Sequence, residues 1–210
     1  MDTTTPNARR GHAESGRVGP EGVAPAAVER RPYQPGRKAS GRAAPERTVP
    51  DRTARAALLE QTRLARGMDW RSLLVLGQSM TYREVSAGSF LYQEGEPGEE
   101  LAVLLSGVLT VVKRDSEGQD ARVGEIHARA VVGEMSLLDG GPRSASVYAQ
   151  TPAALLALNR RALERLLEAH PRVGTRLLAA LAAEVSQRLR LATGRLARRG
   201  GGDAFALEDV

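Results

Sequence analysis

Two oppositely charged side chains occur in an otherwise small and apolar stretch, GEMSLLDGGPRSASV, which runs from Gly133 to Val147. Arg143 stands between GGP and SAS, directly before a segment that is typical of a β-strand. An arginine beside exposed backbone amides is a common protein partner of a phosphate group. Glu134 would repel that anion, so it is better suited to accept a hydrogen bond from a sugar hydroxyl. The stretch therefore predicts a site for one phosphate and one ribose.

The residues between and around the two charges fit this interpretation. Gly133 lets the backbone approach a ligand closely, and residues 134–138 can form one helical turn whose first amides have no partner within the helix. Residues 140–142 then turn the chain sharply back. Ser144 and Ala145 are small enough to leave their amides accessible. We expect the two charges to face one pocket.

Composition excludes several kinds of chemistry. The chain of 210 residues has a net charge of +5, but its basic residues are arginines apart from Lys38 and Lys113, which indicates a composition bias rather than a nucleic-acid-binding face. It has no cysteine, so disulfides and cysteine metal sites are excluded. The histidines, His12, His127 and His170, lie far apart. We therefore expect neither a metal site nor an enzyme, and a cupin in particular would need more histidines than His127 within the β region.

The N-terminal part differs from the rest of the chain. Residues 1–50 contain seven prolines and six glycines among mixed charges. Such a segment buries too little apolar surface to offset its ordering entropy, so we expect disorder. It could be an inert tether, or an arm that docks on a partner or binds nucleic acid. The first residues lack the apolar core of a secretory signal, and no apolar run approaches the roughly 18 residues of a membrane span, so we expect a cytoplasmic protein.

Three kinds of segment follow along the chain. Helix formers fill residues 52–67, and Asp69 can cap a second short helix. Short β-rich runs separated by glycines extend from Met80 to Leu158, which is typical of a β-barrel or sandwich. Asn159 can then cap a helix, and Pro171 suits the first turn of a longer one that ends near Arg199. The order is helices, β-barrel, helix pair.

The last helix carries an apolar stripe that either forms a two-fold seam or packs on the β region. Its members are Leu177, Leu181, Val185, Leu189, Ala192 and Leu196.

The stretch from Gly133 resembles the phosphate-binding cassette of cyclic-nucleotide-binding domains, in which Gly-Glu and an apolar short helix precede Pro-Arg-(Ser/Ala/Thr)-Ala. The resemblance extends from about Trp70 to Arg190 and includes the glycines of EGEPG and LSG. The spacing of Glu and Arg is similar to that in kinase regulatory subunits and channels, and is one residue shorter than in the catabolite activator protein. Val132 departs from the family, where an aromatic residue often precedes Gly-Glu.

The resemblance implies an α+β fold: a double-stranded β-helix, or jelly-roll-like β-roll, flanked by N-terminal helices and a C-terminal helix pair. It predicts a disordered tail over residues 1–50, a cyclic-nucleotide-binding domain over 51–199 and a short tail over 200–210. Within the domain, the β-roll covers about 80–158 and the C-terminal helices cover 159–199.

The resemblance also assigns roles. Glu134 would bind the ribose 2′-hydroxyl and Arg143 the cyclic phosphate, and Leu137 would pass cassette movement to the following helices. Arg190 or Thr193 would cap the base. The residues expected to contribute mainly backbone contacts are Gly133, Met135, Ser144 and Ala145.

The expected ligand is one cyclic mononucleotide, because the cassette has one arginine for one phosphate; no further cofactor is expected. Ser144 can favour guanine, but it is also typical of bacterial members that bind cAMP, and we expect cAMP rather than cGMP. The resemblance thus implies a stand-alone bacterial sensor that signals to an unknown protein partner or through a homodimer formed by the last helix. Only GGGDAFALEDV follows that helix, which is too short for a helix-turn-helix, so DNA binding of that type is not expected. Two alternatives stay open: a ligand-free β-roll that acts as a scaffold, and a nucleic-acid binder that acts through its tail.

Overall fold

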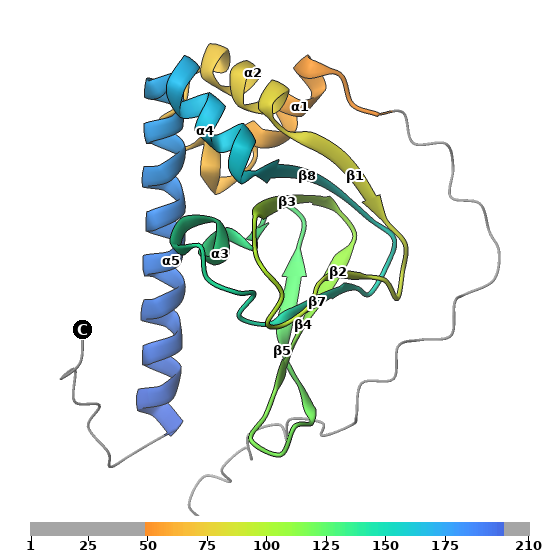
Figure 1. Ribbon diagram of the computed structural model, residues 1–210. Helices are drawn as coiled ribbons and strands as arrows, with labels where there is room; N and C mark the ends of the chain where they lie inside the picture. The colour runs from red at the N-terminus through yellow and green to blue at the C-terminus, as the bar shows by residue number, and fades with distance from the viewer. Residues whose placement is uncertain (1–48, 200–210) are drawn as a thin grey trace, which may run out of the picture.

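The computed structural model describes residues 49–199, with side chains described as far as residue 194. Helices from both ends of this range pack against one side of a β-sandwich (Figure 1). The helices are α1 (Arg52–Glu60), the 3₁₀ turn η1 (Arg63–Ala65), α2 (Trp70–Ser79), α3 (Glu134–Asp139), α4 (Arg160–Ala169) and α5 (Pro171–Arg199). The strands are β1 (Thr81–Val85), β2 (Phe90–Tyr92), β3 (Glu100–Ser106), β4 (Val108–Arg114), β5 (Asp120–His127), β6 (Val131–Val132), β7 (Ser146–Ala149) and β8 (Ala153–Asn159).

The strands form two antiparallel sheets of four. One has the order β1-β8-β3-β6 and the other β2-β7-β4-β5. Both orders bring together strands that are far apart in sequence: β8 lies between β1 and β3, with Ala157 opposite both Thr81 and Ala102. This arrangement confirms the α+β fold with a β-roll that the sequence predicted.

The two central strands of the first sheet, β3 and β8, are buried on both faces because they are apolar at successive positions. In β3, Ala102 and Leu104 face the second sheet, while Leu101 and Val103 pack in the cluster that the helices build. Side chains alternate between the faces of a strand, so a continuous apolar run suits a strand covered on both sides. One hydrophobic core therefore lies between the two sheets. A second core lies on the outer face of the first sheet, where α1, α2, α4 and α5 cover it (Figure 1).

Short polar side chains begin α2 and α4, as the sequence indicated. The Asp69 Oδ1 atom accepts from the Ser72 amide at 2.8 Å, and Asn159 Oδ1 accepts from the Ala162 amide at 2.8 Å. Hydrogen bonds from Ser72 also hold the pKa of the Asp69 carboxyl below its usual range. These caps set where each helix begins relative to the sheet.

The apolar stripe of α5 is core in its first half only. Leu177 and Leu181 are fully buried against the first sheet and the other helices, whereas Leu189 is 66% exposed. The helix continues past the cassette without covering the second sheet (Figure 1). Of the two roles considered for the stripe, packing on the β region therefore holds for the first half of α5.

Two groups of expectations lie outside this description. Residues 1–48 and 200–210 are not described, so the disordered tail and the bounds of the domain stay predictions, as does the place of Leu196 in the stripe. Over the described part of the chain, no helix combines the length and apolar character that a membrane crossing requires.

Candidate functional site

The residues singled out around Gly133 line one cavity of about 110 Å³. Its walls come from the second sheet, from β6 with α3, and from α5. Six of the expected ligand contacts lie here: Gly133, Glu134, Met135, Arg143, Ser144 and Ala145. The apolar part of the wall comprises Val111, Ile126, Val132 and Val147. Val132, the departure from the family pattern, is thus part of this wall.

Gly133 is needed for its conformation and for the space beside it. Its φ of 80° lies in the left-handed region, where side chains are strained. A Cβ atom there would stand 2.6 Å from Arg143 Nη1 and 2.8 Å from the Tyr92 ring. Only glycine lets β6 turn into α3 while the arginine lies against the turn.

The Arg143 side chain is buried without a carboxylate partner. It is 6% exposed, and its Nη1 donates to the carbonyl oxygens of Glu100 at 2.7 Å and Gly133 at 3.1 Å. Among the described residues, no acidic side chain lies within ion-pair distance of it. Burying a cation is costly unless a counter-charge or a full set of hydrogen bonds compensates it, so the site favours an anion.

The turn after β2 holds the backbone of Arg143 in place. The Arg143 amide donates to the Glu96 carbonyl at 2.8 Å, and its carbonyl accepts from the Gly95 amide at 2.9 Å. Lys113 adds a hydrogen bond at the next residue, because its Nζ donates to the Ser144 carbonyl at 2.6 Å. Sequence reasoning had used this EGEPG turn only as a glycine pattern, whereas the structure shows that it anchors the arginine.

Tyr92 is a site residue that the sequence reasoning missed. The Arg143 guanidinium carbon lies 3.6 Å from the centre of the Tyr92 ring, which is the geometry of a cation–π contact. Burial raises the pKa of the Tyr92 hydroxyl, and that oxygen has no hydrogen-bond partner among the described residues. The ring fixes the plane of the guanidinium and shields it from water.

Arg188, on α5, is a second such residue. Its Nη1 lies 2.6 Å from Glu134 Oε1, and its Nη2 donates to the Val131 carbonyl. It lies next to Leu189 of the apolar stripe, and its side chain is 43% exposed beside the nearly buried Glu134. No feature of the sequence pattern singled it out.

The remaining expected residues lie apart from the cavity. Arg190 donates to Ser186 Oγ and Thr193 donates to the Leu189 carbonyl, both within α5, and neither lines the cavity. Their role as base caps stays a prediction. Leu137 is 1% exposed and belongs to the cluster that α4 and α5 share, which is where a relay would have to lie.

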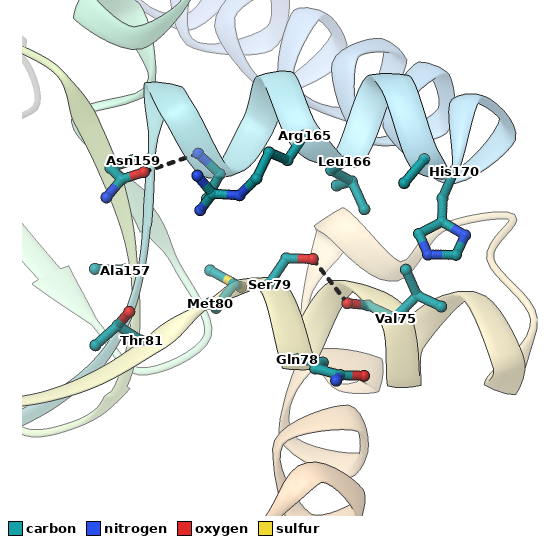
Figure 2. Close-up of a pocket in the computed structure, with 12 residues that line it drawn as sticks. Val75, Gln78, Ser79, Met80, Thr81, Ala157, Asn159, Arg165, Leu166 and His170 are labelled. Carbon is teal, nitrogen blue, oxygen red and sulfur yellow. Dashed lines mark hydrogen bonds between the residues drawn. The ribbon is translucent and has the colours of Figure 1, made fainter.

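A larger groove of about 450 Å³ lies elsewhere, between α2 and α4 (Figure 2). Met80 and Leu166 are among the residues that line it, and its ionisable side chains, Arg165 on α4 and His170 directly after that helix, are exposed. A search of the described residues finds no group of three or more His, Cys, Asp or Glu side chains that could hold a metal ion. The buried charges thus mark the small cavity, not the large groove, as the candidate site.

Comparison with known proteins gives the same assignment. The sequence model of the cyclic nucleotide-binding domain matches residues 82–170, which include β1 to α4 and the whole cassette. A crystal structure of a cyclic nucleotide-binding domain from Methylobacillus flagellatus is similar with a TM-score of 0.65 and 28% identity, covering 72% of this chain and 85% of that one. The chain therefore contains a cyclic nucleotide-binding domain. The cassette predicted from the sequence, Gly133 to Ala145, lies within the matched residues.

Two relatives of known function match part of this chain. The CRP-like cAMP-activated global transcriptional regulator of Mycobacterium tuberculosis is 26% identical over 125 residues, which are 60% of this chain and 56% of the regulator. Glutaminase 1 of Bradyrhizobium diazoefficiens is 30% identical over 138 residues, which are 66% of this chain and 22% of that protein. The matched region is thus little more than half of the regulator and a minor part of the glutaminase.

Proposed function

We propose that this chain is a non-enzymatic sensor that binds one cyclic mononucleotide, cAMP in preference to cGMP, in the cavity beside the cassette. The observation that carries the proposal is Arg143: a buried guanidinium that lines a cavity and has no carboxylate partner within the described residues. A singly charged cyclic phosphate would supply the missing negative charge. Gly133, Met135, Ser144 and Ala145 would contribute backbone contacts around it.

Glu134 supports a ribose beside that phosphate. It lines the same cavity, is 1% exposed and can accept a hydrogen bond from the 2′-hydroxyl. The preference for cAMP is supported by the mycobacterial regulator, which is described as cAMP-activated. The base would lie along the apolar wall, with Arg190 or Thr193 reaching it after α5 moves.

The size of the cavity supports a mechanism of signalling. Pockets that enclose a drug-sized ligand commonly measure roughly 300–1,000 Å³, several times the volume of about 110 Å³ found here. Ligand binding must therefore displace part of the wall. Leu137 connects the cassette to the core beneath α4 and α5, so we infer that the displacement reaches these helices and changes a homodimer or a docking surface for a protein partner. This would occur in the cytoplasm.

Thermal unfolding with and without ligand tests the proposal. At about 100 times its dissociation constant, a ligand should raise the free energy of unfolding by about 2.7 kcal/mol. For a domain of this size the melting temperature then rises by roughly 5–10 °C. We expect this shift with cAMP, a smaller one with cGMP at the same concentration and none with cyclic di-GMP.

Variants show whether the shift arises at the cassette. Truncating a buried, hydrogen-bonded charge costs roughly 2–5 kcal/mol of binding, so Arg143→Ala should weaken cAMP about 1,000-fold and abolish the shift. Arg143→Lys keeps the positive charge but loses the two hydrogen bonds to carbonyl oxygens. It replaces Arg143→Ala in this test if the alanine variant fails to fold. Arg165→Ala, in the larger groove, is the matched control and should keep the full shift. A wild-type protein that unfolds cooperatively with no shift from any nucleotide would instead be a ligand-free scaffold.

A further inference from the structure

Arg188 joins three parts of the site through one guanidinium. It extends from α5, contacts Glu134 Oε1 with Nη1 and donates to the Val131 carbonyl in β6 with Nη2. The planar guanidinium can serve two acceptors in fixed directions, which a lysine ammonium cannot reproduce. The orientation of the Glu134 carboxylate is therefore tied to both α5 and the sheet.

The two oxygens of Glu134 are in different situations. Oε1 is held by Arg188, whereas Oε2 is buried and has no hydrogen-bond partner among the described residues. Buried polar atoms in folded proteins almost always have a partner, so an orphaned oxygen in a cavity-lining side chain points to a missing donor. Because a carboxylate oxygen only accepts, the missing group must carry an N–H or O–H.

The electrostatic balance of the cavity also depends on Arg188. A buried carboxylate beside an anionic ligand would repel it, and Arg188 is the cation that lies within ion-pair distance of Glu134 in the described structure. Because Arg188 balances the negative charge of Glu134, the positive charge of Arg143 remains available to the anion. Arg188 thus makes a carboxylate compatible with a phosphate in the same small cavity.

We propose that Arg188 is a positioning residue that holds one oxygen of Glu134 so that the other is presented to a ligand hydroxyl, and that it thereby sets the selectivity for ligands that carry this hydroxyl. The inference rests on the proposed function of the cavity. It goes beyond that function by making a residue outside the cassette responsible for recognition of the sugar.

The test compares the affinities for cAMP and 2′-deoxy-cAMP, which differ only in the hydroxyl. Leaving a buried acceptor without its donor costs roughly 1–3 kcal/mol, so wild-type protein should bind cAMP about tenfold or more tightly than the deoxy compound. In Arg188→Gln the carboxylate is no longer held. The affinity ratio should fall to about threefold or less. Both affinities should also decrease, because the carboxylate is no longer neutralised.

Three further variants separate positioning from charge. Arg188→Lys restores the charge but not the two-acceptor geometry, so it should recover affinity for both ligands and only part of the ratio. Arg172→Gln makes the same change at an exposed position near the start of α5 and should leave both affinities unchanged. In a Glu134→Ala background, adding Arg188→Gln should not change the ratio further. Urea unfolding of each variant checks that it folds.

The outcomes are distinct. A fall of the ratio in Arg188→Gln, with partial recovery in Arg188→Lys, supports the proposal. An unchanged ratio with both ligands equally weakened overturns it and leaves Arg188 a purely electrostatic or structural role. A larger ratio also overturns it, because Arg188 would then compete with the hydroxyl for Glu134. Wild-type protein that binds neither nucleotide would refute the proposed function itself, and this is seen before any variant is made.

Discussion

The groove between α2 and α4 is larger than the cassette cavity, but it is the cassette cavity that contains buried charge. The groove is about 450 Å³ and the cavity about 110 Å³. Met80 and Leu166 line the groove, and its ionisable side chains, Arg165 and His170, are exposed. The smaller cavity contains Glu134 and Arg143, which are 1% and 6% exposed. Burying charged side chains costs free energy, so they are retained mainly where they have a function. Buried charge therefore indicates the candidate site better than volume does.

The comparison also shows how each region is held. The groove is a space left between two helices that pack on the first sheet, and its shape follows from the core. The cavity is held by specific hydrogen bonds that join the cassette to the turn after β2, to β3 and to α5. Substitutions at the groove should therefore change stability alone, whereas those at the cassette should change ligand affinity as well.

The largest effect on stability is expected from a residue that lines the groove. Leu166→Ala removes a side chain that is 2% exposed, and should lower the free energy of unfolding by about 3 kcal/mol in urea unfolding. The affinity for cAMP, measured on the folded variant, should stay within about twofold of wild type. Leu189→Ala makes the same change at a position that is 66% exposed and should have little effect. A large loss of affinity in Leu166→Ala would show that the two regions are coupled.

A smaller effect is expected where the cassette turns out of β6. Gly133→Ala and Gly118→Ala both place a side chain at a positive φ, of 80° and 75°, but only Gly133 has atoms closer than 4 Å to the new Cβ. Both variants should show the left-handed strain. Gly133→Ala should lose about 1 kcal/mol more because of overpacking. It should also bind cAMP more weakly, since Arg143 must move. Equal losses of stability and unchanged affinity would contradict the close contact.

The smallest effect is expected at the helix cap beside the groove. Asn159→Ala removes the acceptor for the Ala162 amide and should lower the free energy of unfolding by about 1 kcal/mol. Asn159→Asp keeps that acceptor and should retain most of the stability. Thermal unfolding of both variants with and without cAMP should show the same ligand-induced shift as wild type. A reduced shift in Asn159→Ala would mean that the start of α4 takes part in binding.

Local features of the site could be predicted from the sequence because they depend on neighbouring residues. Gly133, the helical turn after it and the return of the chain to Arg143 follow from residue types at short spacing. The caps at Asp69 and Asn159 are local for the same reason. Six of the seven cavity-lining residues of the cassette could therefore be named in advance, and Ser136 is the one that was missed.

The sequence by itself determined the cassette, the order of helices and strands, and the presence of one carboxylate and one arginine in the same cavity. Only the tertiary structure decided which groups surround those charges. Tyr92 reaches Arg143 because β2 pairs with β7, and Arg188 reaches Glu134 because α5 packs beside α3. These partners lie about fifty residues away in the chain. Sequence spacing specifies which residues are neighbours within one helical turn or one strand. Contacts between residues so far apart in the chain depend on how whole helices and strands pack together.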